Sequence, residues 1–172
     1  MTVIIDGTAG ITFPVTAGSA SAVQASSGRV LQVVSAKCGN GTSTARIPVD
    51  NTTPTNTEGV QIWTASITPT SSSNTVLVFG GCQASGGANS LYYQFALFRG
   101  STCIGAWQAE NSWSNAGVML TICVIDSPAT TSSTTYSVRA STDSNTFYYG
   151  SVFNNNFGNL GENYYILQEI AA

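Results

Sequence analysis

The sequence predicts an all-β protein, an antiparallel β-sandwich of jelly-roll type with an extended N-terminal β-arm. Three observations predict this fold. Serine and threonine contribute 22 residues each, and their hydroxyl groups compete with a helical backbone for hydrogen bonds. Charged helix formers are scarce, because only 8% of the residues are charged. Short apolar runs alternate with loops rich in glycine, serine, asparagine and proline, and no long run has helical spacing.

The first 28 residues differ in composition from the rest of the chain. Two short apolar segments, 2–5 and 11–15, flank an Asp-Gly turn signal, and the stretch that follows is rich in alanine, serine and glycine. We expect residues 1–28 to be an attachment or oligomerisation arm with a linker, and residues 29–172 to be the sandwich. The apolar arm residues expected to make the attachment are Val3, Ile5, Ile11 and Phe13.

Two kinds of strand pattern follow the arm. Tyr136–Ser141 and Trp63–Ile67 alternate apolar and polar side chains, as in a sheet with one solvated face. Val118–Ile125 and Val76–Phe79 are nearly continuous apolar runs, which predicts strands covered on both faces. The expected strands are 29–37, 60–68, 75–83, 91–98, 102–108, 117–126, 134–142, 146–153 and 164–170.

Eight or nine short strands separated by turn signals favour a jelly roll, with an immunoglobulin-like sandwich as the alternative. The connecting loops are too polar to be expected in the core. The first of them is about 20 residues long, and a loop of that length usually has a function or is held by a neighbour. The expected loops are 39–59, 69–74, 84–90 and 127–133.

The charge distribution argues against nucleic acid as a partner. The net charge is −3, and the five basic residues are scattered along the chain, so no basic footprint for phosphates is visible. The amino terminus lacks the features of a signal peptide, and no apolar stretch approaches the roughly 20 residues that span a bilayer. We therefore expect no membrane insertion. A surface with so little charge is typical of a subunit that is held in an assembly.

The residues for catalysis are largely missing. Histidine is absent, the eight acidic residues occur singly, and no phosphate-binding loop is present, so we expect no enzymatic activity and no cofactor. Asp126 precedes Ser-Pro, where an aspartate commonly caps a turn. The four cysteines lack metal-site spacing, so we expect buried free thiols and no metal; a Cys82–Cys103 disulfide is the alternative.

Two aromatic clusters are candidates for contact with a glycan or receptor. One lies in 107–113, in an expected loop, and the other follows Phe147. Aromatic faces stack on sugars, and carboxylate or amide groups orient hydroxyls. The competing interpretation is that these aromatics cover the sandwich or pack at a subunit interface. The candidate residues are Trp107, Glu110, Asn111, Trp113, Tyr148, Tyr149 and Asn155.

The opening MTVIIDGTAGITFP resembles the start of tailed-bacteriophage appendage proteins, and further blocks resemble the same group of tail-fibre and virion structural proteins. These blocks are VLQVV (30–34), SITPTSSSNTVLV (66–78), FRGSTCIG (98–105), DSPATTSSTTYSVRAS (126–141) and the closing LQEIAA. The chain departs from the group in 38–59 and 110–115, where partner specificity could reside.

The resemblance implies a non-enzymatic virion protein with a β-sandwich, assembled in the host cytoplasm as a homo-oligomer, commonly a trimer. We expect a tail- or head-fibre subunit that joins other virion proteins through its arm and contacts a host surface glycan. A capsid decoration or cement protein that stabilises the head is the alternative. A lectin-like carbohydrate-binding module is a third hypothesis.

Overall fold

The computed structural model describes residues 4–6, 10–12, 28–87, 92–110, 117–151 and 162–172, the first two ranges as backbone only. All regular secondary structure in these ranges is strand. The strands are β1 (Ile4–Asp6), β2 (Gly10–Thr12), β3 (Val30–Lys37), β4 (Gly41–Ser43), β5 (Val60–Ile67), β6 (Thr75–Gly86), β7 (Tyr92–Arg99), β8 (Thr102–Glu110), β9 (Gly117–Asp126), β10 (Thr134–Thr142), β11 (Phe147–Tyr149) and β12 (Tyr164–Ile170). No helix of membrane-spanning length and hydropathy occurs in the described part of the chain.

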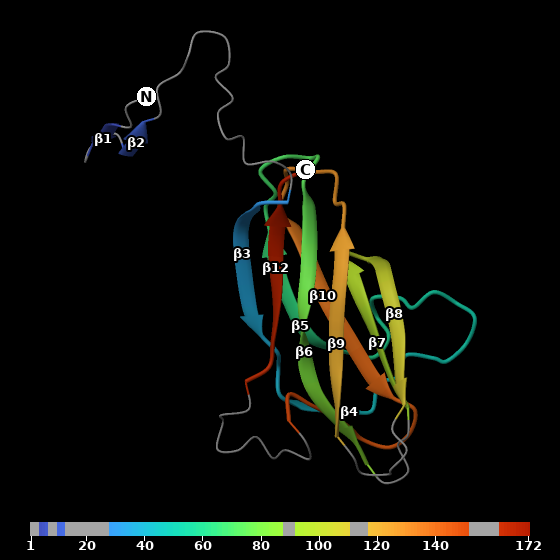
Figure 1. The fold of residues 1–172 in the computed structure, drawn as a ribbon. Coiled ribbons are helices and arrows are strands. Elements are labelled where there is room, and N and C mark those ends of the chain that lie inside the picture. Colours follow the sequence, from blue (N-terminus) through green and yellow to red (C-terminus); the bar gives the residue numbers. More distant parts are fainter. Residues whose placement is uncertain (1–3, 7–9, 13–27, 88–91, 111–116, 152–161) are drawn as a thin grey trace.

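Two antiparallel sheets form the sandwich (Figure 1). The four-stranded sheet has the order β5-β10-β7-β8. In the six-stranded sheet, β3, β12, β6 and β9 lie side by side, and β11 and β4 extend the sheet next to the far end of β6. In the view of Figure 1, β10 crosses behind the strands of the six-stranded sheet, so the two sheets form two layers.

The strand pairing confirms the predicted jelly roll. The pairs are β3 with β12, β5 with β10, β6 with β9 and β7 with β8, so the second half of the sandwich retraces the first half in reverse order. Successive pairs belong to alternate sheets, which is the winding of a jelly roll rather than of the immunoglobulin-like alternative. The innermost pair closes through the tight turn after Arg99, where Gly100 has a φ of +58°.

The core lies between the two sheets. Each strand contributes every second side chain to it, because side chains alternate across a strand. Large aromatic residues link the layers: the rings of Trp63 and Tyr165 lie 5.4 Å apart, and Trp63 Nε1 donates a hydrogen bond of 2.9 Å to the carbonyl of Ala36. The largest fully buried core residues are Tyr93, Tyr136, Tyr165, Phe147, Ile62, Ile67, Leu97, Leu120, Ile122 and Leu167.

The predicted strand positions agree with most of the sandwich. The bounds of β9, β10 and β12 match the predicted ranges, whereas predicted strand 146–153 shortens to β11. The sequence reasoning missed β4, whose residues pair with β11, which in turn pairs with the last residues of β6. These residues were expected to be loop, because their glycine, serine and threonine content gives no strand signal of its own.

The long loop before β5 is partly core, so the expectation that 39–59 stays outside the core is wrong. Ile47 is 5% exposed and packs with Ala96, Phe98 and Cys103 on the outer face of the four-stranded sheet. Its backbone N–H donates to Ser141 Oγ at 3.0 Å. The loop crosses that face and covers it, which a polar composition did not predict.

The cysteines occupy different environments. Cys38 and Cys82 are buried in the main core, and their thiols interact with each other. Cys103 packs in the separate cluster with Ile47, and Cys123 is exposed. All four are free, so the alternative Cys82–Cys103 pairing is not formed. Cys82, on β6, packs in the core between the two sheets, whereas Cys103 packs on the outer face of the four-stranded sheet.

Candidate interaction surface

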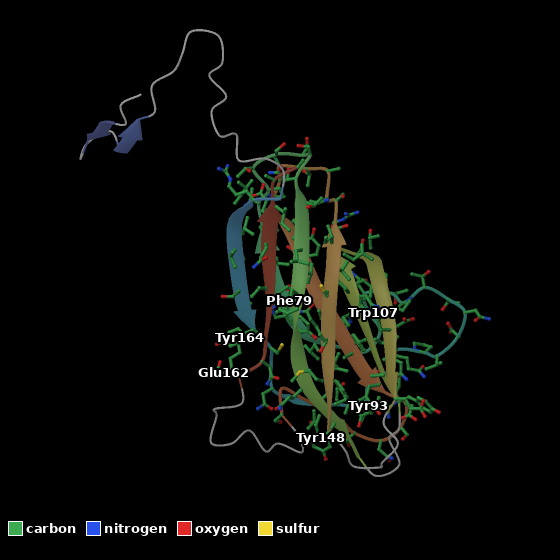
Figure 2. All side chains as sticks on the ribbon, viewed as in Figure 1. Phe79, Tyr93, Trp107, Tyr148, Glu162 and Tyr164 are labelled. Atoms are coloured by element: carbon green, nitrogen blue, oxygen red, sulfur yellow. The ribbon has the colours of Figure 1, made fainter. Side chains whose placement is uncertain are left out.

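The outward-facing side of β3, β12, β6 and β9 is apolar, and no described residue covers it. The nearly continuous apolar runs predicted strands covered on both faces, and for a single chain this prediction is wrong: Ile125 is 65% exposed and Phe79 48% exposed. Figure 2 labels Phe79 and Tyr164 on these strands. We call this surface the outer apolar face, and it consists of Val30, Val33, Leu77, Phe79, Met119, Cys123, Ile125, Tyr164, Ile166 and Ile170.

Strand register places these side chains in rows across the sheet. Ile166 lies opposite Phe79, which in turn lies opposite Cys123. In the next row, Leu77 lies opposite Ile125. Directly opposed residues of antiparallel strands have Cβ atoms about 5 Å apart, so each row is a continuous ridge of contacts. The outer apolar face is therefore one patch and not a scatter of single hydrophobic residues.

The face carries almost no charge. Among the described residues of its four strands, Lys37 is the one charged side chain that points outward, and its Nζ pairs with Glu162 Oε1 at 2.8 Å. The hydrogen bond from Lys37 lowers the pKa of Glu162, and the same bond raises the pKa of Lys37. The remaining outward polar residues are uncharged: Ser35, Thr75, Gln83, Thr121 and Gln168. A charged ligand would find no unpaired partner there.

The opposite outer face of the sandwich is built differently. The loop around Ile47 covers part of it, and the guanidinium of Arg139 anchors that loop by donating to the carbonyls of Glu58 and Gly59 at 2.6 and 2.8 Å. Its uncovered part is polar, with Ser66 and Thr135 joined by a hydrogen bond of 2.8 Å. Only the six-stranded sheet leaves an apolar surface of this extent among the described residues.

Of the predicted glycan-contact residues, Trp107 and Glu110 lie on β8, which continues past the predicted strand 102–108 to Glu110, where a loop was expected. The Trp107 ring stacks on Phe95 with 5.5 Å between centroids, and its indole also lies against Gly105. Glu110 ends the strand, exposed and opposite Tyr92. Asn111 and Trp113 lie outside the described residues. The stacking makes Trp107 part of the packing of this sheet edge.

The second predicted cluster lies in the other sheet. Tyr148 and Tyr149 belong to β11, and Tyr149 stacks on Phe147 with 5.9 Å between ring centroids. A Cβ at Gly41 would come within 2.9 Å of the Tyr149 hydroxyl, so the ring also lies close to β4. Asn155 lies outside the described residues. The two predicted clusters thus come from strands of different sheets.

A cavity of about 240 Å³ lies between the covering loop and strands β7 and β8. Its lining combines apolar groups with the polar side chains of Asp50, Gln94 and Gln108, and Trp107 contributes to one wall. The volume is below the roughly 300–1,000 Å³ of typical ligand pockets. The cavity is therefore too small to enclose an extended ligand.

The burial of one acidic residue, Glu169, was not predicted from the sequence. Glu169 is fully buried and accepts hydrogen bonds from Gln32, Thr70 and Asn74. A signal was present, since Glu169 shares its strand parity with core residues Tyr165 and Leu167. An acid at a core position of a strand indicates a hydrogen-bonded network.

Asp126 does not act as the expected turn cap. Its carboxylate binds Arg99 Nη1 at 2.7 Å and accepts a hydrogen bond of 2.6 Å from the Tyr136 hydroxyl. Burial and the neighbouring carboxylate raise the pKa of Tyr136. Asp126 belongs to one sheet and its two partners to the other, so this cluster ties the sheets together near one end of the sandwich.

No group of three or more potential metal ligands is present within the ranges that the structure describes. In the arm, Ile5 lies opposite Ile11 in the β1–β2 register, whereas Val3 and Phe13 lie outside the described residues.

No known family model and no curated protein matches this sequence. Among solved structures, the infectious bursal disease virus Gx strain gives a TM-score of 0.45 at 11% identity, covering 85% of this chain and 38% of that one. The VP2 subviral particle of infectious bursal disease virus gives 0.42 at 9% identity, covering 81% and 32%. The insecticidal delta-endotoxin Cry8Ea1 from Bacillus thuringiensis gives 0.40 at 8% identity, covering 67% and 19%.

The chain thus spans well under half the length of these solved proteins. Similarities at this level assign no family. The jelly-roll description rests on the strand pairing of this chain.

Proposed function

We propose that this chain is a non-catalytic structural subunit of a bacteriophage particle, in a tail or head fibre that contacts the host surface. The outer apolar face is the observation that carries the proposal. Apolar patches of this extent on soluble proteins mark surfaces that other molecules cover. Inside an assembly, neighbouring subunits bury such a face permanently.

The acidic residues support a role without catalysis. Six of them already bind groups of the protein itself: Asp50, Glu58, Asp126, Asp143, Glu162 and Glu169. A glycosidase, for example, needs two carboxylates that face a common substrate. Acids committed to capping, ion pairing and buried hydrogen bonds do not provide that arrangement.

The resemblance to tailed-phage appendage proteins supports the location in a virion. Its blocks include core strands, such as VLQVV in β3 and part of SITPTSSSNTVLV in β6. They also include the opening segment that contains β1 and β2. A two-stranded hairpin is marginally stable alone, so this hairpin is expected to dock on another sheet or subunit. That expectation supports an arm that joins the chain to other virion proteins or to copies of itself.

Localisation in the particle tests the proposal. A reconstruction of purified particles should show this chain at fibre positions, and deletion of residues 1–28 should leave a folded sandwich that no longer joins particles. Full coverage of the capsid surface would instead indicate the decoration protein. Absence from particles, or turnover of a substrate by the purified chain, would contradict a structural role.

The cavity beside β8 supports the contact with a host glycan. Trp107→Ala is a poor test, because the loss of its stacking on Phe95 would disturb the sheet. Gln108 lines the cavity and is exposed, so Gln108→Ala should reduce binding to a glycan array while the fold is preserved. Gln61→Ala, at an exposed position of β5, is the matched control. Equal binding by both variants would exclude this cavity as the contact site.

A further inference from the structure

We infer that the outer apolar face binds the same face of a second copy of this chain. The inference rests on the proposed structural role, and it names a second copy of this chain as the partner of the outer apolar face. The two faces would stack as sheets do in a sandwich, with side chains of both copies interleaved about 10 Å from sheet to sheet.

The sequence pattern argues that this face is normally covered. In β9, outward Met119, Cys123 and Ile125 alternate with inward Leu120 and Ile122, so apolar side chains line both sides of one strand. The uncovered outer side of the four-stranded sheet is polar instead, as expected of a surface that faces water. Apolar residues on both faces indicate a strand buried on both faces. The single chain buries one, so another molecule is expected to bury the other.

The size of the face suits an association of two copies. Four strands about 4.8 Å apart and four outward positions along each give a surface of roughly 20 Å by 20 Å, or about 400 Å² when flat. Two stacked faces remove about 800 Å² of flat area, and more when side-chain relief is included. This approaches the roughly 1,000 Å² expected of a specific interface. The association is therefore expected to be concentration-dependent.

Charge also favours a second copy. Identical surfaces repel each other when they carry unpaired charge, and here the one outward charge, Lys37, is already paired with Glu162 at one end of the face. A nucleic acid would need several free cations, and a membrane surface would favour a basic rim. The outer apolar face has neither among its described residues, whereas it is complementary to itself.

Light scattering and thiol labelling of the full chain test the inference. We expect concentration-dependent pairing, and we expect Phe79→Glu, which places a charge near the centre of the face, to weaken it at least about tenfold. Gln61→Glu adds the same charge at an exposed position of the opposite sheet and should leave the association unchanged. Circular dichroism should show that both variants keep their strand content.

Cys123 provides an independent measurement, because it is the exposed cysteine and lies in the row of Phe79. Its reaction with Ellman's reagent should slow as the protein concentration rises, should stay fast in Phe79→Glu, and should disappear in Cys123→Ser. An oligomer that persists in Phe79→Glu with a fast-reacting Cys123 would overturn the inference, since the interface would lie elsewhere.

A monomer at all concentrations would also overturn it. A protected Cys123 in that monomer would indicate that the chain's own arm covers the face. Either result leaves the proposed function intact if the chain is found in particles. Pairing through this face by a chain that is absent from particles would instead contradict the proposed function alone.

Discussion

The side-chain amide of Asn74 donates a hydrogen bond of 2.6 Å to the carboxylate of Glu169, which lies 95 residues further along the chain. Thr70 adds bonds from its backbone N–H and its hydroxyl at 2.6 and 2.8 Å, and Gln32 Nε2 adds another at 2.6 Å. One buried carboxylate thus connects β3, β12 and the loop between β5 and β6.

This network predicts a loss of stability in acid. Burial raises the pKa of Glu169, but the hydrogen bonds from Gln32, Asn74 and Thr70 outweigh burial and lower the pKa to about 2. Because the folded pKa lies below the ordinary value near 4.5, the stabilisation is complete above that value and is lost as the pH falls toward 2. Urea unfolding at pH 7 and pH 3 should show the decrease.

The substitution Glu169→Gln tests the same network at neutral pH. It keeps the shape of the side chain but replaces a charged acceptor, so we expect a loss of about 2 kcal/mol in the free energy of unfolding. The variant should also show a smaller difference between pH 7 and pH 3. Glu110→Gln, at an exposed strand end, should change neither value. Equal acid sensitivity in both variants would assign the effect to other groups.

The cluster of Asp126, Arg99 and Tyr136 predicts a second stability effect. Asp126→Ala leaves Arg99 and the Tyr136 hydroxyl without their acceptor, and because the ion pair is partly exposed we expect a loss of about 2 kcal/mol, between surface and buried pairs. Tyr136→Phe removes one bond and should cost about 1 kcal/mol. A double-mutant cycle measures their coupling, and strictly additive losses would show that the hydroxyl and carboxylate do not interact.

The pairing of β6 with β12 predicts a strong effect at Gly80. Its φ is +147°, and a Cβ there would overlap the backbone of Tyr164 and Tyr165. Gly80→Ala should therefore prevent close pairing and cost about 3 kcal/mol or more, measured by thermal unfolding. Gly100→Ala also has a positive φ but meets open space, so it should cost only about 1 kcal/mol. Equal losses of stability in the two variants would mean that the positive φ, and not the overlap with Tyr164 and Tyr165, accounts for the loss at Gly80.

The covering loop predicts a local effect at Ile47. Its truncation to alanine removes a buried side chain from the cluster with Ala96 and Phe98, which should cost about 2–4 kcal/mol. Amide hydrogen exchange should accelerate in the loop before it does so in the sheets. Val49→Ala, at a residue 69% exposed, should have little effect on either measurement. Unchanged exchange in Ile47→Ala would show that the loop is held by its polar contacts instead.

Several elements were predictable from local pattern. The alternation in Tyr136–Ser141 identified β10 and its inner face, and β9 and β12 have the predicted bounds. The short strand β4 and the buried Ile47 were not predictable, because each depends on a partner distant in the sequence. For the candidate surface, apolar runs indicated strands with two covered faces, but strand order decided which of those faces remains open.

The sequence by itself determined that this chain forms strands of an all-β sandwich, and that few charges are available for chemistry. Those properties follow from residue type and from the two-residue period of a strand, both of which are local. Only the tertiary structure decided that Asp126 meets Arg99, that Ile47 covers one sheet, and that Phe79 faces outward beside Ile166 and Cys123. Such relationships depend on register and on the order of strands, which bring together residues that no local pattern connects.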